Sequence, residues 1–201
     1  MAVPDVEGSP AAVRRPDRSS VTATDWVDAA AAVFADRGLT AMRVEALARD
    51  LGVTKGSFYW HFADRHALVA AVVDRWETEH TEAMIDESSQ GDTPADQLHR
   101  LVVAVSSRVG ESRGLQLLYV EAEREGVREA VDRVTSRRID FLAGLLVELG
   151  QDREEAERRS VLALSSSLGM QQLLTGAPQA LRRESLDRER LTAFLYATLL
   201  G

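Results

Sequence analysis

Apolar residues recur along most of the chain at intervals of three and four positions, the spacing that places side chains on one face of an α-helix. Trp26, Ala30 and Phe34 form the first such stripe, and Leu68 and Val72 belong to a longer one. No segment shows the alternation of apolar and polar residues that is typical of a half-buried β-strand. The pattern therefore predicts an all-α protein with about nine helices.

Capping residues indicate where the first helices begin and end. Thr22 and Asp25 have the spacing of a capping box, so the first helix is expected to begin near Thr22. Gly38 ends this helix, and Gly52 ends a short second helix. Thr54 is expected to cap a third short helix that extends to about residue 59.

The rest of the chain predicts one long helix and then five more. Asp64 can cap the long helix, and glycine and proline residues separate the helices that follow. The expected spans of these five helices are 94–109, 114–124, 126–149, 153–175 and 187–200. Residues 1–20 lack any apolar period and contain Arg14, Arg15 and Arg18, which predicts a disordered basic arm.

The second and third helices have the organisation of a helix-turn-helix, in which a glycine-containing turn joins two short helices. Val53, Phe58 and Phe62 are the expected apolar anchors of this unit. The polar side chains of residues 55–59 then face outward. Short polar and aromatic side chains on such a helix suit entry into the major groove of DNA.

The stretch FADRGLTAMRVEALARDLGVTKGSFYWHFADRHALV resembles the DNA-binding region of the TetR family of transcriptional regulators. The matching parts are Gly38, the core ALARDLGVTKGSFYWHF, and the acidic cap that precedes a basic residue at the start of the fourth helix. The resemblance covers about residues 22–76. It implies a helix-turn-helix DNA-binding domain at residues 21–66 and a helical regulatory and dimerisation domain at residues 67–201.

The resemblance also implies which residues contact DNA. The third helix, at about residues 54–60, is expected to enter the major groove, and His61 and Arg65 occupy phosphate-contact positions. The predicted DNA-binding residues are Thr40, Arg43, Thr54, Lys55, Gly56, Ser57, Tyr59, His61 and Arg65.

Two positions depart from the family pattern. Met42 stands where a Thr or Ser commonly caps the second helix, so Thr40 or Arg43 is expected to take over this role. Glu45 stands where some members place a base-reading arginine. A carboxylate there cannot pair with phosphate or guanine, although it can accept a hydrogen bond from cytosine N4.

Family members of this kind are homodimeric and respond to a ligand, so a repressor of a palindromic operator is expected. The last two helices carry more apolar surface than one helix pair can bury, which predicts a four-helix dimer interface. Its expected residues are Leu164, Leu168, Gln172, Leu191, Phe194, Leu195, Thr198 and Leu199. The resemblance further implies a pocket for a small-molecule effector, with Trp76, His80, Tyr119 and Met170 as its expected residues.

The net charge of −8 does not decide whether the protein binds DNA. Residues 20–68 contain five basic and six acidic side chains, so the predicted DNA-binding region is nearly neutral and most of the excess acid lies further along the chain. The chain has no cysteine and no apolar run long enough to cross a bilayer. A cytoplasmic protein with no metal, no cofactor and no membrane partner is therefore expected.

Two other functional classes are considered. An enzyme is not expected, because the sequence has no phosphate-cradling glycine loop, no HExxH motif and no Cys-His or Ser-His pairing. A helical interaction module that keeps this fold without reading DNA is the second alternative, favoured by Glu45 and the negative net charge. Retention of duplex DNA that is lost with added salt would distinguish a regulator from both classes.

Overall fold

The computed structural model describes residues 21–108, 113–176, 178–182 and 188–201, and within these residues all regular structure is helical. The predicted all-α class is confirmed. Counting α4, the turn that follows it and α5 as one continuous helix gives nine helices in the described part of the chain. The proposed basic arm, with Arg14, Arg15 and Arg18, lies outside the described residues.

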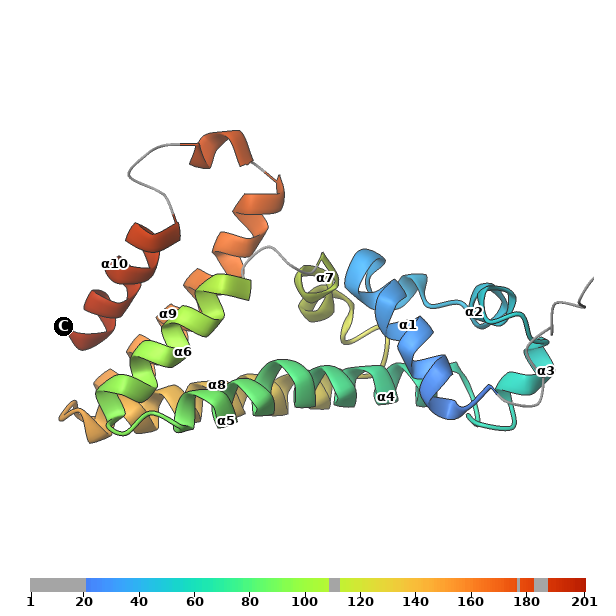
Figure 1. Cartoon of the computed structure of the whole chain (residues 1–201), viewed down its shortest axis with the longest axis horizontal. Helices are drawn as coiled ribbons and strands as arrows, with labels where there is room; N and C mark the ends of the chain where they lie inside the picture. The colour runs from blue at the N-terminus through green and yellow to red at the C-terminus, as the bar shows by residue number, and fades with distance from the viewer. Residues whose placement is uncertain (1–20, 109–112, 177, 183–187) are drawn as a thin grey trace, which may run out of the picture.

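The N-terminal part consists of α1 (Ala23–Arg37), a 3-10 turn η1 (Leu39–Ala41), α2 (Val44–Asp50) and α3 (Lys55–Phe58). Thr22 and Asp25 form the predicted capping box at the start of α1. Gly38 ends α1 with a φ of 82°, a conformation that glycine adopts without steric cost. These elements lie at one end of the molecule, with α3 furthest from the C-terminal helices (Figure 1).

One long helix runs from this end toward the other. It consists of α4 (Arg65–Glu77), a π-helical turn η2 (Thr78–Glu82) and α5 (Ala83–Ser89). The carboxylate of Asp64 accepts a hydrogen bond from the backbone N–H of Ala67 and so caps the helix as predicted. The π turn was not expected from the sequence. Such turns insert one residue into the helical register and often occur at functional sites.

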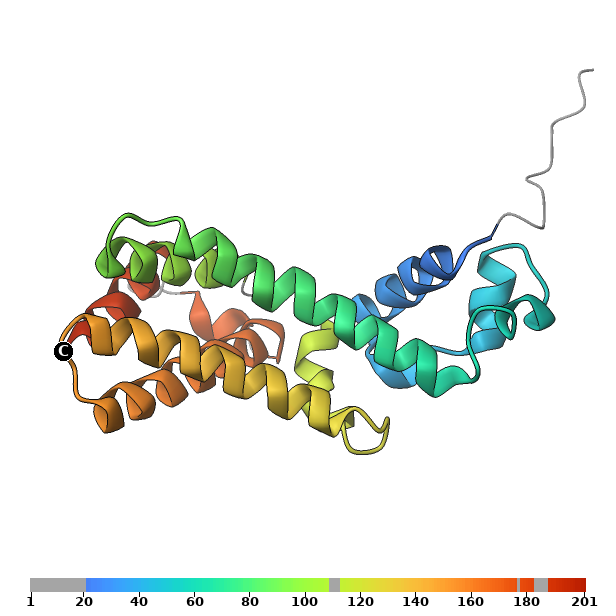
Figure 2. The same ribbon diagram turned by 90° about the horizontal axis from the view of Figure 1, so that it is seen from below.

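The remaining helices form the C-terminal body. They are α6 (Pro94–Arg108), α7 (Arg113–Glu121), α8 (Arg128–Glu148), α9 (Arg153–Gly176), the 3-10 turn η3 (Pro178–Leu181) and α10 (Arg188–Leu200). Seen from below, α8 runs beside the long helix (Figure 2). Ion pairs join the two, with Arg133 on Glu77 and Arg137 on Glu82. The predicted spans agree with these helices, except that α7 ends three residues earlier than expected.

The apolar core is organised in two clusters. The first includes Trp26, Phe34 and Phe58 of the N-terminal part and continues into α7 and α8 through Leu118 and Val131. The second lies among α6, α8, α9 and α10. The N-terminal part therefore shares its core with the body. No described helix is both long enough and apolar enough to span a membrane.

Candidate nucleic-acid interface and internal cavity

The α3 helix is held in place by one buried aromatic side chain and presents two others outward. Phe58 is fully buried. Its ring packs edge-on against Trp26, with centroids 5.2 Å apart, and stacks on Phe62, with centroids 5.4 Å apart. Tyr59 is 56% exposed and Trp60 is 88% exposed. Tyr59 was expected on this surface from the sequence, but Trp60 was not, because a tryptophan side chain usually favours burial.

The turn before α3 and the helix itself have little internal packing. Gly52 has a φ of 70°, and the N–H of Val53 closes the turn by donating to the carbonyl of Ala48. A methyl group added at Gly56 would meet only the hydroxyl of Thr54, at 3.6 Å. Gly56 is therefore not required by the fold of the free protein, and its small size leaves the backbone of α3 open to a partner.

Lys55 and Glu45 form an ion pair on this surface. The Nζ atom of Lys55 donates to the Oε1 atom of Glu45 at 2.5 Å, and both side chains are largely exposed. The hydrogen bond from Lys55 lowers the pKa of Glu45 and raises that of Lys55. The acid that departs from the family pattern is thus the partner of the lysine that was expected to reach a base.

The expected caps of α2 and α3 require correction. Arg43 occupies the capping position of α2 and Thr54 that of α3, but neither side chain forms a capping hydrogen bond. Thr40 lies in the turn η1, before α2. Met42, which stands in place of the usual capping residue, is fully buried and belongs to the core instead.

Arg65 is directed into the protein, in contrast to the phosphate-facing position that the family pattern suggests. Its guanidinium donates to the carbonyls of Met42 at 2.7 Å and Leu39 at 2.8 Å. A third bond, of 2.6 Å, reaches the carboxylate of Glu125, whose side chain is only 7% exposed. Arg65 therefore fixes the turn between α1 and α2 against the loop after α7.

A second carboxylate from the body holds the same turn. Glu121 accepts hydrogen bonds from the backbone N–H of Leu39 at 2.7 Å and from the hydroxyl of Thr40 at 2.7 Å. Thr40 also accepts a hydrogen bond from Arg124. Thr40 is thus engaged by the α7 region. We call the N-terminal part of the molecule the head. Glu121, Glu125 and Arg65, with the backbone of residues 39–42 that they hold, then form the head–body clamp.

Two glycines allow α7 to approach α1 this closely. A methyl group at Gly114 would lie 1.9 Å from the carbonyl oxygen of Phe34, so α7 rests directly on the backbone of α1. A methyl group at Gly38 would lie 2.8 Å from Glu121 Oε2. The clamp and these contacts make α7 the bridge between the two parts of the molecule.

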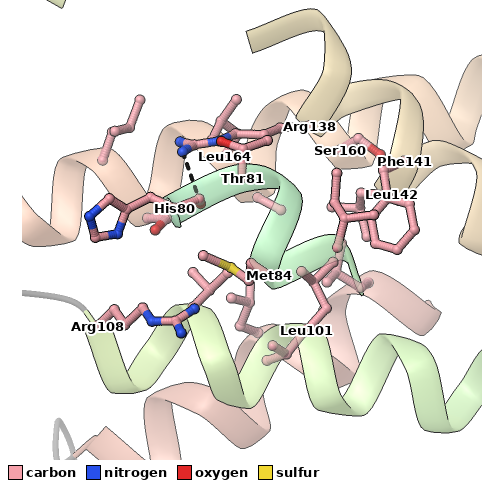
Figure 3. Close-up of a pocket in the computed structure, with 18 of the residues that line it drawn as sticks. His80, Thr81, Met84, Leu101, Arg108, Arg138, Phe141, Leu142, Ser160 and Leu164 are labelled. Atoms are coloured by element: carbon pink, nitrogen blue, oxygen red, sulfur yellow. Dashed lines mark hydrogen bonds between the residues drawn. The ribbon is translucent and has the colours of Figure 1, made fainter. Parts of the chain in front are cut away.

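The body contains a partly open cavity of about 160 Å³. Residues of the long helix that line it are Trp76, His80, Thr81, Met84 and Ile85, and those of α6 are Leu101, Val102, Val105 and Arg108. The α8, α9 and α10 helices contribute Arg138, Phe141, Leu142, Ser160, Ala163, Leu164, Ser167, Leu168, Gln171, Leu195 and Leu199. Figure 3 shows side chains from these elements converging on the space.

The cavity lining differs from the expected one. Some of the predicted pocket residues do not line the cavity, and some of the predicted interface residues do. Trp76 and His80 line the cavity as expected, but Tyr119 and Met170 do not. The hydroxyl of Tyr119 instead accepts a hydrogen bond from Thr135. Four residues that were assigned to a dimer interface line the cavity, namely Leu164, Leu168, Leu195 and Leu199.

The π turn supplies part of the cavity wall and is held by a partly buried arginine. Arg138 donates to the hydroxyl of Thr81 at 2.9 Å and to the carbonyl of His80 at 3.3 Å, the bond drawn in Figure 3. Its guanidinium also lies over the ring of Trp76, 4.8 Å from the centroid. Burial lowers the pKa of Arg138, which nonetheless stays charged because an arginine does not lose its proton in proteins.

The outer faces of α9 and α10 carry apolar side chains that no described residue covers. Phe194 is 71% exposed and Leu162 is 66% exposed. On α9, Leu162, Gly169 and Leu173 follow one another at helical spacing and all are exposed. Of the predicted interface residues, Gln172, Phe194 and Thr198 are on the exposed surface, whereas Leu191 is half-buried.

No group of three or more His, Asp or Glu side chains in the described part of the chain could hold a metal ion. His66, two residues after Asp64, contacts the backbone carbonyl of Glu125 through Nδ1.

Comparison with known proteins supports the interpretation of the N-terminal part. Residues 27–72 match the family model described as bacterial regulatory proteins, tetR family. The A-factor receptor protein of Streptomyces griseus is 33% identical over 136 residues, which cover 64% of this chain and 44% of that protein. The chain thus spans less than half the length of the curated relatives that it matches.

Solved structures share the fold. A TetR transcriptional regulator from Legionella pneumophila superposes with a TM-score of 0.72 at 18% identity, covering 89% of this chain and 97% of that one. The structure of BioQ with its double-stranded DNA operator gives a TM-score of 0.54 at 19% identity, covering 90% of this chain and 99% of that one. At such identities the likeness concerns the fold.

Proposed function

Because the chain belongs to the TetR family of bacterial regulatory proteins, we propose that it is a ligand-responsive repressor that binds operator DNA as a homodimer. One observation carries this proposal. The helix that presents exposed Tyr59 and Trp60 sits at one end of the long helix α4–α5, and the other end of that helix lines an internal cavity. One continuous helix would thus join the proposed DNA-reading surface to the proposed ligand site.

The proposed DNA contacts follow from exposure on and around α3. Tyr59, Trp60 and His61 are exposed at its end and would hold phosphates and sugars, which fix register without reading sequence. Lys55 and Ser57 would approach base edges in the major groove. Arg43, Thr54 and Gly56 lie on the same exposed surface and complete the contact set. BioQ, which has this fold, is known in complex with its operator.

Thr40 and Arg65 receive a different proposed role. Both are engaged by Glu121 or Glu125, so they position the helix-turn-helix on the body rather than contact DNA. The binding surface is accordingly smaller than the family pattern suggests. Positioning by the clamp would keep the angle between α3 and the body fixed.

Dimerisation is proposed through the outer faces of α9 and α10. Uncovered side chains such as Leu162, Leu173 and Phe194 are typical of an interface, because monomers rarely expose contiguous apolar surface. The small residues Ser165 and Gly169 on the same face would let two helices approach closely. Pairing about a two-fold axis would make the operator an inverted repeat with half-sites about one helical turn apart.

The ligand would act by favouring one spacing of the two DNA-binding parts over another. A hundredfold loss of operator affinity requires about 2.7 kcal/mol of coupling between the sites, and the coupling is reciprocal. The A-factor receptor, a relative, is named for a ligand that it receives. We propose the cavity of this chain as the effector site.

Selection from a randomised duplex library tests the proposal without knowledge of the operator. The purified protein is mixed with the library, bound duplexes are recovered, and the enriched sequences are determined over successive rounds. An inverted repeat should be enriched by the wild type. A variant that combines Lys55→Ala with Tyr59→Ala should enrich none. Failure of the wild type to enrich any sequence would reject a sequence-specific regulator and favour a helical interaction module.

A further inference from the structure

The cavity contains two arginines and no carboxylate. Arg138 comes from α8 and Arg108 from the end of α6, while the rest of the lining is apolar or uncharged apart from His80. Charged groups are costly to bury without a partner of opposite charge. The carboxylates that act on these arginines, Glu87 on Arg108 and Glu77 on Arg138, are not among the residues that line the cavity.

The groups that hydrogen-bond to Arg138 or stack on it are uncharged, and Glu77 acts on it through its charge without forming an ion pair. These groups are the hydroxyls of Thr81 and Tyr119, the carbonyl of His80 and the ring of Trp76. Among the described residues, no carboxylate forms an ion pair with it. Arg133 and Arg137, on the same helix, pair with Glu77 and Glu82 respectively. Of these three arginines of α8, Arg138 is the one that lines the cavity and forms no ion pair with a described residue.

The side chain of Arg108 lines the cavity but is partly exposed to solvent. Its Nη2 atom lies 3.7 Å from a carboxylate oxygen of Glu87. Its Nη1 atom is buried and has no hydrogen-bond partner among the described residues. A buried donor without an acceptor costs free energy unless a bound molecule accepts its hydrogen bond. The Nη1 atom of Arg108 is thus a donor that a bound acceptor could satisfy.

In the close-up view (Figure 3) the two guanidinium groups lie on the same side of the cavity, and the side chains that line the opposite side are mainly apolar. In Figure 3 the nitrogen atoms of Arg108, Arg138 and His80 are on one side, and Phe141 and Leu142 are on the opposite side. The hydroxyl of Ser160, near the apolar end, is already bonded to the carbonyl of Ala156. The cavity, of about 160 Å³, is comparable to one of about 150 Å³ that admits benzene.

We propose that the effector of this protein is an amphipathic organic anion, such as a medium-chain carboxylate. Its head group would bind Arg108 and Arg138, and its apolar part would lie along Phe141 and Leu142. Guanidinium groups suit a carboxylate because their paired donors match its two oxygens. That the bound anion regulates DNA binding rests on the proposed function. That the cavity binds an anion rests only on the residues that line it.

Binding of an anion to Arg138 would also reach the long helix. The same guanidinium holds the carbonyl of His80 and the hydroxyl of Thr81 in the π turn between the DNA-binding part and α5. An anion that draws Arg138 away would release these two groups. The π turn is thus the element through which this ligand would act on α4.

Calorimetric titration of the full chain with octanoate and with octanamide tests the proposal. The two probes share an eight-carbon chain and differ in charge. Wild type is expected to bind octanoate at least about tenfold more tightly than octanamide, as expected for charge-assisted hydrogen bonds. Arg108→Met and Arg138→Met should each reduce this preference, and the double variant should remove it.

Matched controls separate the loss of this site from a general loss of charge or fold. Arg100→Met on α6 and Arg137→Met on α8 remove arginines that do not line the cavity, and both should keep the preference. Arg138→Lys keeps a cation and should retain part of it. Circular dichroism identifies any variant that fails to fold, and the lysine variant then carries the test at that position.

Equal affinity for the two probes, absence of saturable octanoate binding, or an unchanged preference in the double variant would each overturn the proposal. Enrichment of operator sequences is measured without any probe, so the two claims fail separately. A protein that selects an operator but does not prefer the anion loses only this inference. One that prefers the anion but selects no DNA loses only the proposed function.

Discussion

At the scale of single residues, the surface of α3 depends on which aromatic side chains are buried. Phe58 is fully buried while Trp60, two positions further on, is 88% exposed. A sequence of four consecutive aromatic or histidine residues, Tyr59 to Phe62, does not say which member faces out. The helix ends after Phe58, so the periodicity that would assign faces is lost there.

Tyr59→Ala and Trp60→Ala should each weaken binding to operator and to random duplex by a similar factor, because phosphate and sugar contacts carry no sequence information. Trp60→Ala should change the free energy of unfolding by less than about 0.5 kcal/mol, as is usual for exposed positions. Phe58→Ala is the contrasting variant and should lose about 3–5 kcal/mol. Anisotropy titrations and urea unfolding measure these effects. A Trp60→Ala protein with unchanged affinity for both duplexes would remove Trp60 from the contact set.

The Lys55–Glu45 pair predicts opposite effects for its two members. Glu45→Gln should raise DNA affinity about two- to fivefold, because an exposed ion pair is weak but must be broken or shared when Lys55 meets DNA. Lys55→Ala should lower operator affinity by about 5- to 150-fold per half-site if the lysine reads a base. Both are measured against the same duplex at one salt concentration. Weaker binding by Glu45→Gln would instead indicate that Glu45 orients Lys55 or reads cytosine.

A substitution of Arg65 tests whether this residue positions the helix-turn-helix on the body or contacts a DNA phosphate. Arg65→Ala should lower the free energy of unfolding by about 1–3 kcal/mol, because it removes the closer of the two arginines that pair with the buried Glu125. Arg124, 3.6 Å from Glu125, and the partial exposure of Arg65 limit the effect. A pure phosphate contact would leave stability unchanged and flatten the salt dependence of binding by about one unit of slope. Arg49→Ala, at an exposed position of α2, serves as the control. Sequence reasoning could not separate these roles, because Glu125 lies sixty residues away.

At the scale of elements, local signals predicted where helices begin and end, but not how they meet. The capping box of Thr22 and the cap of Asp64 are short-range patterns, and both are confirmed. The π turn at Thr78–Glu82 was missed because one inserted residue hardly alters a stripe that recurs every three or four positions. The seating of α7 on α1 was missed because a glycine in a helix does not reveal which backbone approaches it.

Two helical glycines test the seating of α7. Gly114→Ala should lower the free energy of unfolding by about 1–3 kcal/mol, because the methyl group would meet the backbone of Phe34 and force α7 away. Gly144→Ala, in α8, meets nothing within 4 Å and should raise it by about 0.5–1 kcal/mol. Thermal or urea unfolding compares the two. Equal effects in the two variants would mean that α7 does not rest on α1 in solution.

At the scale of the whole molecule, apolar helical faces served two purposes that the sequence could not distinguish. Leu164 and Leu195 line the cavity, whereas Leu162 and Phe194, only one or two positions away, point outward. One apolar stripe is indistinguishable from another until the neighbouring helices are in place. The cavity could be anticipated only as a family property, and only Trp76 and His80 of its expected residues line it.

The outward faces predict the dimer contact. Leu162→Glu and Phe194→Glu should each give folded monomers with greatly reduced operator affinity, since a charge at the centre of an apolar interface is buried without a partner. Val120→Glu, at an exposed apolar position on α7, should remain dimeric and is the control. Leu195→Glu is unsuitable because it would also damage the cavity. Sedimentation velocity reports the mass, and dimers in both test variants would refute this interface.

The ratio of the affinities for a selected and a scrambled duplex most directly tests the claim that this protein is a sequence-specific DNA-binding regulator. The affinity of the wild-type protein is measured for a duplex obtained by selection and for a scrambled duplex of the same composition, at one salt concentration near 0.15 M. A sequence-specific regulator is expected to bind the selected duplex at least about a thousandfold more tightly, with one dimer on each inverted repeat. Equal affinity for the two duplexes would contradict the account, however tightly the protein binds either of them.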